Sequence, residues 1–162
     1  MWHLFRRGGA IALLAAVTCA FGQETCAKDL EADELTATIN RAVGITSAFR
    51  DAFSNMTLDT ATSTVSTVGA TLVGGAMAHE LAAVAEGLRQ VVRVRDRLSE
   101  RNAREIAMTQ LRAAMAEAGI RARRVSAGYG GVVRMSASPE VRQLAVDGML
   151  FADGLSRRWS CQ

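Results

Sequence analysis

Proline, aromatic residues and histidine are scarce in this sequence, and each shortage narrows the kinds of protein that it can encode. Proline occurs once in 162 residues, and aromatic residues make up 5% of the chain. Alanine, arginine, leucine and glutamate are abundant, and this combination favours helices over sheets. The length suits one domain with a core of its own. We therefore expect a single all-α domain.

Histidine occurs at two positions, His3 and His79, which leaves few ways to build a catalytic centre. His79 and Glu80 match the first half of the HExxH pattern of metalloproteases, but Ala83 stands where the second metal-binding histidine is needed. No serine lies in a nucleophile-elbow motif that could use His79 as a base. We expect no catalytic residue, no metal ligand and no cofactor, and we place His79 at the surface or at its boundary with the core.

Long hydrophobic runs are also missing, apart from a short one near the N-terminus. Residues 11–21 are apolar and follow Arg6 and Arg7, and small residues then allow cleavage after Ala20 or Gly22. The run is too short for a comfortable membrane span. We predict a secretory signal peptide over residues 1–22, a single domain over 23–162, and a periplasmic or secreted bacterial protein. A retained anchor is the alternative.

The signal-peptide prediction leaves two cysteines in the mature chain, Cys26 and Cys161. In an oxidising compartment such a pair most simply forms a disulfide. It would close a loop of about 135 residues, and the chain-entropy model assigns such a loop about 4–5 kcal/mol. Two free thiols are the alternative. A metal site is not expected, because no CxxC motif or cluster of histidines accompanies them.

The segment from residue 29 to residue 56 has the spacing of an amphipathic helix. Apolar residues recur at alternating intervals of four and three, as in helices that pack at a shallow angle in a bundle. Acidic residues crowd its first turns, where the helix dipole favours negative charge. We interpret them as helix-start charges and not as the carboxylate pair of a hydrolase. The predicted buried positions are Leu35, Ile39, Ala42, Thr46, Phe49, Phe53 and Met56.

Small residues four apart follow this first segment, a spacing that lets helices approach closely. They also permit an alternative, the insertion of residues 65–85 into a membrane. Hydroxyl groups and glycines are too frequent there for an ordinary span, so close packing in a bundle is the preferred interpretation. The residues that define the spacing are Ser66, Ala70, Gly74 and Ala78.

Glycines and polar breaks predict where the middle helices end. We expect one helix over residues 58–73, a break at Gly74-Gly75, and a longer helix over residues 76–118 with an interruption near 99–102. Gly119 then suits a C-terminal stop.

Residues 121–138 lose the helical spacing. Valines flank the glycine-rich run 128–131, which predicts a small β-hairpin, with a flexible loop as the alternative. The run lacks the strand, the helix and the lysine of a phosphate-binding loop. Ser138 as N-cap and Pro139 at the first position then begin a final helix. The fold expected is an up-and-down bundle of about four helices, whose last helix returns the chain to the end where it began.

Charge divides the mature chain into two halves. Residues 24–87 hold nine acids and three bases, whereas residues 88–162 hold fourteen arginines and seven acids. The functional interpretation is a basic face for an acidic envelope protein or an anionic surface such as lipid headgroups. The alternative is that the two halves neutralise each other. The predicted partner-binding residues are Arg89, Arg93, Arg97 and Arg101 on a helix, and Arg121, Arg123, Arg124 and Tyr129 in the segment after it.

These observations favour a non-enzymatic, exported helical bundle that acts through protein contacts in a cell-envelope or secretion-type assembly. Nucleic acid is not an expected partner, because aromatic residues do not interleave with the basic ones. Peripheral membrane contact and homo-oligomerisation stay open. One alternative is a membrane-active protein that inserts residues 65–85. The other is a hydrolase, which requires a deep cleft that collects carboxylates or His79.

Overall fold

The chain folds into a bundle of four long helices. The computed structural model describes residues 26–56 and 64–160, and these include a short helical turn over residues 26–29. We call residues 26–30 the N-terminal turn. All regular structure in the described ranges is helical, which confirms the all-α prediction. The long helices are α2 (Ala32–Met56), α3 (Val65–Arg97), α4 (Arg101–Met135) and α5 (Pro139–Ser160).

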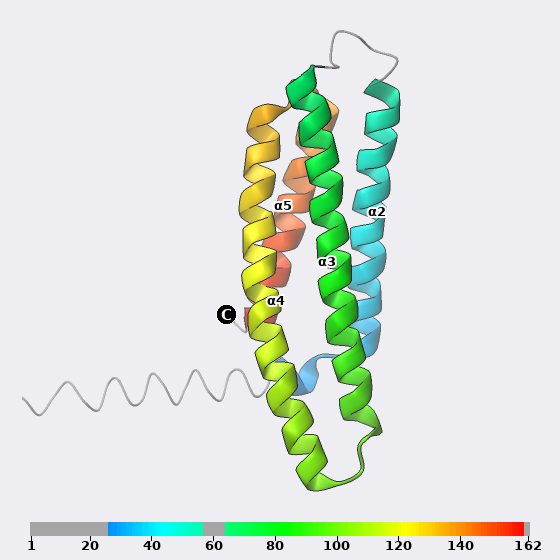
Figure 1. Ribbon diagram of the computed structural model, residues 1–162, viewed down its shortest axis with the longest axis vertical. Helices are drawn as coiled ribbons and strands as arrows, with labels where there is room; N and C mark the ends of the chain where they lie inside the picture. The colour runs from blue at the N-terminus through cyan, green and yellow to red at the C-terminus, as the bar shows by residue number, and fades with distance from the viewer. Residues whose placement is uncertain (1–25, 57–63, 161–162) are drawn as a thin grey trace, which may run out of the picture.

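Helices that follow each other along the chain lie side by side and antiparallel (Figure 1). Extensive contacts join α2 to α3, α3 to α4 and α4 to α5, whereas α5 contacts α2 and α3 only sparsely. The longest helices are α3 and α4, with 33 and 35 residues. Their connected ends project beyond α2 and α5 at the bottom of Figure 1. The bundle therefore has one end that is built mainly from a two-helix hairpin.

An aromatic cluster holds the middle of the bundle together. Phe49 of α2 and Tyr129 of α4 stack with ring centroids 6.1 Å apart. The Tyr129 hydroxyl donates a hydrogen bond to the carbonyl oxygen of Gly74 in α3 at 3.0 Å. Gly148 of α5 lies so close that an added Cβ would be 2.6 Å from Tyr129 Cζ. Each long helix thus contributes one residue to a single cluster.

The predicted helix break at Gly74-Gly75 is wrong, because α3 runs unbroken through both residues. Gly74 is buried, and a side chain there would overlap the Phe49 ring. Glycine in a helix interior costs about 1 kcal/mol relative to alanine. The close approach of α2 and α3 at this point outweighs that cost. The glycine pair marks a helix contact and not a helix end.

The predicted β-hairpin or loop over residues 121–138 is also wrong, because α4 continues to Met135. Gly119 does not stop the helix, since it is buried where α4 meets Ser160 of α5. Gly128 lies against Met77 of α3, where a side chain would overlap the methionine. Packing here overrides the low helix propensity of glycine. Buried residues keep the helical spacing throughout, at Ala118, Ala122, Val125, Tyr129 and Val132.

The connections between helices follow the sequence prediction more closely. The interruption expected near residues 99–102 is the turn between α3 and α4. Pro139 is the first residue of α5, and the Ser138 hydroxyl accepts a hydrogen bond from the Val141 amide at 3.3 Å. The Ala137 amide donates to Thr67 Oγ1 at 2.9 Å, which joins this turn to the start of α3. The turn between α4 and α5 is thus fixed by polar contacts.

Candidate functional site

Basic side chains gather where α3 turns into α4. We call this region the arginine-rich end, and define it as residues 89–112 together with the N-terminal turn that lies against them. It holds eight basic residues and four acidic ones. Because the connected ends of α3 and α4 project beyond α2 and α5, much of this excess of positive charge lies on a prominent part of the surface (Figure 1).

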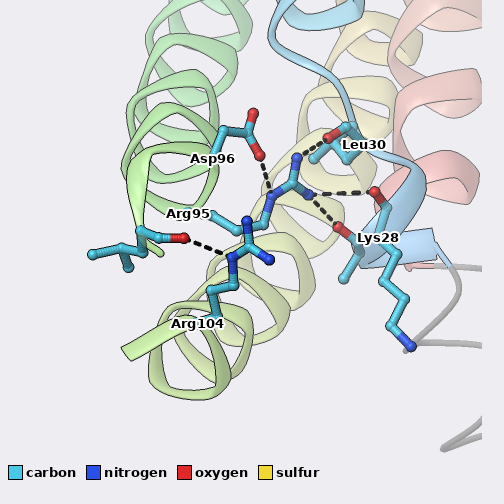
Figure 2. A network of polar contacts seen from close by, with 7 residues as sticks. Lys28, Leu30, Arg95, Asp96 and Arg104 are labelled. Atoms are coloured by element: carbon cyan, nitrogen blue, oxygen red, sulfur yellow. Dashed lines mark hydrogen bonds and ion pairs between the residues drawn. The ribbon is translucent and has the colours of Figure 1, made fainter. Parts of the chain in front are cut away.

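Arg95 fastens the N-terminal turn to the hairpin (Figure 2). Its Nη1 donates hydrogen bonds to the carbonyl oxygens of Ala27 and Lys28 at 2.7 and 3.4 Å, and its Nη2 donates to that of Leu30 at 3.1 Å. Its Nε pairs with Asp96 at 2.7 Å. The last carbonyls of a helical turn have no partner within it, and a guanidinium offers several donors at once. Ala27 and Leu30 are fully buried, so the turn is held by both polar and apolar contacts.

Arg104 holds the turn between the two long helices. Its Nε donates a hydrogen bond to the carbonyl oxygen of Leu98, the C-cap of α3, at 2.6 Å (Figure 2). The predicted site omits both Arg95 and Arg104, because the four-residue spacing that singles out the other arginines passes them by. Their roles depend on which backbone carbonyls the fold brings near them. The spacing of basic residues in the sequence does not predict those contacts.

A pocket of about 530 Å³ opens at Arg104. Lys28 of the N-terminal turn and Ser99 of the α3–α4 turn form part of its wall. The basic lining residues outnumber the acidic ones four to one, so the hollow favours a negatively charged occupant. The remaining lining residues are Arg101, Arg104, Glu105, Met108, Thr109 and Arg112.

The structure divides the four arginines predicted to share one helix face. Arg89, Arg93 and Arg97 belong to α3, whereas Arg101 begins α4. Arg93, Arg97 and Arg101 are exposed. The Arg89 side chain is 20% exposed, pairs with Glu86 at 2.5 Å and donates to Thr36 of α2 at 3.1 Å. Arg89 therefore joins α2 to α3, and the other three face solvent.

The second predicted group of partner-binding residues lies on the helix α4 and not in a loop. Arg121, Arg123 and Arg124 are exposed, and Arg121 pairs with Glu117 of the same helix at 2.6 Å. Tyr129 is fully buried in the aromatic cluster. Its place in the core excludes it from a binding surface, which corrects the prediction for this residue.

The predicted disulfide and signal peptide extend beyond the described residues. Cys26 lies half-buried in the N-terminal turn, and Cys161 is outside the described ranges. Residues 1–22 are outside them as well. The pairing of the two cysteines and the cleavage of the signal peptide therefore stay predictions.

His79 is exposed on α3 and does not line the pocket at the arginine-rich end. Glu105 is the single carboxylate of that pocket. Within residues 26–56 and 64–160, no three His, Cys, Asp or Glu side chains are grouped so that they could hold a metal ion. The hydrolase alternative requires a cleft with several carboxylates or with His79, and this pocket has neither.

Helix α3 is the one described helix that is long and apolar enough to cross a membrane. Its most apolar stretch of 18 residues has a mean hydropathy of 1.4, and 39% of that stretch is buried inside the bundle. A helix from the core of a bundle meets the same criterion of length and composition. The hydropathy of α3 therefore agrees with either interpretation of residues 65–85.

Three exposed arginines and a basic pocket thus occupy the projecting end of the molecule. Relatives add nothing to this picture, because no family model, curated protein or solved structure matches the chain.

Proposed function

We propose that this protein is a non-enzymatic, exported helical bundle that acts through protein contacts in a cell-envelope or secretion-type assembly. The observation that carries the proposal is the position of Arg93, Arg97 and Arg101, which are exposed on the projecting end of the α3–α4 hairpin. The sequence of residues 1–22 supports export. The partner that this surface fits is a protein with an acidic face.

The contrast between arginines that bond to the backbone and arginines that are exposed supports a docking role. Arg95 and Arg104 bond to backbone carbonyls and hold the shape of the end. The exposed arginines are therefore presented on a fixed scaffold, and a partner need not order them at great entropic cost. Arginine is enriched at protein interfaces because its planar guanidinium can bind carboxylates in pairs of hydrogen bonds. Positive charge on a projection also accelerates the encounter with an acidic partner.

Charge reversal tests this surface. The partner is first identified by crosslinking in living cells from a photoreactive residue placed at Val94, which is 55% exposed and lies between Arg93 and Arg97 in the sequence. The affinity of the purified pair is then measured for the R93E/R97E variant. We expect it to fall at least about tenfold, and to depend on salt as an ionic interface should.

The matched control is R50E/R142E, which reverses two exposed charges on α2 and α5. It should bind the partner almost as well as the unaltered protein does. If the two double variants bind equally well, the surface assignment fails. Circular dichroism of both variants checks that they keep their helices.

The membrane-active alternative has one observation in its favour, the apolar stretch of α3 together with its exposed Val65, Leu72 and Val73. Carbonate extraction of envelope fractions separates the two functions, because a bundle held by protein contacts is released and an inserted helix is not. Retention in the membrane pellet of protein from which residues 1–22 have been removed, so that no anchor is left there, would replace the docking proposal by the membrane one.

A further inference from the structure

We propose that the pocket at the arginine-rich end is a binding site for a phosphomonoester group. Its volume of about 530 Å³ lies within the range of small-ligand sites. Its walls come from three separate segments, the N-terminal turn, the α3–α4 turn and α4. This inference goes beyond the docking function and does not depend on it, since a pocket can bind a phosphate group whether or not the hairpin also binds a protein.

The arrangement of the basic side chains suits a bound anion. Arg104 uses its Nε on the Leu98 carbonyl, which fixes the guanidinium and leaves its two Nη groups for a ligand. Figure 2 shows this guanidinium on the side of the hairpin that carries the N-terminal turn and Lys28. Arg101 pairs with Glu105 at 3.4 Å in an exposed contact, which is weak enough for an anion to compete for the arginine.

The chemistry of the lining favours a phosphomonoester over a carboxylate. A phosphomonoester carries close to two negative charges at neutral pH and three oxygens that accept charge-assisted hydrogen bonds. Arg101 and Arg104 offer two guanidinium groups to a doubly charged ligand, and Glu105 is the single acidic side chain of the lining. The hydroxyls of Ser99 and Thr109 add polar contacts, and Met108 gives an apolar wall for the organic part of the ester.

Glycerol 3-phosphate is the probe, and its binding to the purified protein is measured by titration calorimetry at physiological salt. We expect saturable binding at one site per chain. Glycerophosphoglycerol, a phosphodiester with the same glycerol unit and a single negative charge, should bind about tenfold more weakly, because it lacks the second charge. Absence of saturable binding, or equal affinity for the diester, would overturn the proposal.

Two pairs of variants locate the site. T109E places a carboxylate in the pocket, and its control A113E adds the same charge at an exposed position of α4 outside the lining. K28Q/R101Q removes two lining charges, and its control R50Q/R124Q removes two exposed charges elsewhere. Each pocket variant should lose about tenfold in affinity and each control less than about twofold. Equal losses in variant and control would mean a general attraction to a basic protein, which would also overturn the proposal.

The phosphate group can belong to a soluble metabolite or to a lipid, and vesicles distinguish the two sources. Vesicles with phosphatidic acid present a lipid phosphomonoester, and vesicles with phosphatidylglycerol at equal charge present a diester. Cosedimentation with the former alone, lost in T109E, identifies a lipid headgroup. Calorimetric binding without that cosedimentation identifies a soluble ester. T109E leaves Arg93 and Arg97 in place, so the docking function and the phosphate site can fail separately.

Discussion

At the scale of single residues, Tyr129 is the most constrained side chain in the molecule. Its ring stacks on Phe49, its hydroxyl bonds to the Gly74 carbonyl, and Gly148 leaves room for it on α5. Burial raises the pKa of Tyr129 above its ordinary value, because the phenolate would be poorly solvated there. The unfolded chain therefore loses this proton at a lower pH than the folded protein does. As a result, the buried phenol favours the folded state only while it is protonated.

The unfolding free energy should therefore fall as the pH rises above about 10, the ordinary pKa of tyrosine. Tyr129 is the only tyrosine in the sequence, so the ultraviolet absorbance of tyrosinate reports on it alone. We expect the signal to appear near pH 10 in denaturant and only at higher pH in the folded protein. The unfolding free energy of Y129F should be about 1 kcal/mol lower at neutral pH, because the hydrogen bond to Gly74 is gone. It should also fall less steeply as the pH rises, because no phenol can ionise. An ordinary titration in the folded protein would contradict the buried position.

Two glycines of α5 should respond in opposite ways to the same substitution. An alanine Cβ at Gly148 would be 2.6 Å from Tyr129 Cζ, whereas at Gly154 no atom lies within 4 Å. We expect G148A to lower the unfolding free energy by about 1–3 kcal/mol through overpacking. G154A should raise it by up to about 1 kcal/mol, because alanine is the better helix former. Urea denaturation measures both. Equal effects would show that Gly148 is not the contact point of α4 and α5.

At the scale of elements, the start of α5 and the turn between α3 and α4 were predictable from sequence, and the glycines were not. Ser138-Pro139 signals a helix start through side-chain and backbone chemistry that is local to the chain. A glycine within a helical segment has two meanings, a helix end or a close contact, and only the facing residue decides between them. Phe49 decides for Gly74, and Met77 decides for Gly128. Both lie on other helices, so the spacing of residues around each glycine could not identify them.

The attachment of the N-terminal turn depends on Arg95. The R95M variant keeps the aliphatic bulk but loses the hydrogen bonds to three carbonyls, and we expect a cost of about 2 kcal/mol because the side chain is only 13% exposed. Hydrogen exchange should accelerate in residues 26–30, while the core of α3 and α4 keeps its protection. R93M, at an exposed position of the same helix, should change stability by less than about 0.5 kcal/mol. Unchanged exchange in the N-terminal turn of R95M would refute this role.

The ends of α2 and α5 bear on the predicted disulfide. Arg158 Nε and Nη2 donate to the two oxygens of Glu34 at 3.0 and 3.1 Å, which joins the last turn of α5 to the first turn of α2. Cys161 follows α5 directly in the sequence, and Cys26 shortly precedes α2. The two helices that lie next to these cysteines in the sequence are thus joined at the same end of the bundle.

If the chain is exported as predicted, the mature protein should be two hydrogens lighter by mass before reduction than after it. The C26S/C161S variant should lose about 2–4 kcal/mol of unfolding free energy, because its unfolded chain is no longer constrained. C19S, which changes the cysteine of the predicted signal peptide, should leave the mature mass and stability unchanged. Two free thiols in exported protein would refute the bridge.

At the scale of the whole molecule, charge is distributed unevenly along the bundle. The division into an acidic and a basic half is visible in the sequence, and it directs attention to residues 88–112. The four-residue spacing alone cannot tell which arginines are structural, because Arg89 shares it with Arg93 and Arg97 and differs from them only in what the fold places beside it. The pocket was equally hidden, since it needs Lys28 to lie beside α4.

The sparse contact between α2 and α5 has a consequence for how the protein folds. The contacts between the two helices include the Arg158–Glu34 pair and the Arg41 guanidinium, which lies 4.7 Å from the centre of the Phe151 ring. Most of the remaining packing joins helices that are consecutive in the chain. Such local contacts give a low contact order, and helical proteins of this kind fold in about microseconds to milliseconds. Each hairpin can form before the next, so the chain can acquire its core progressively along its length.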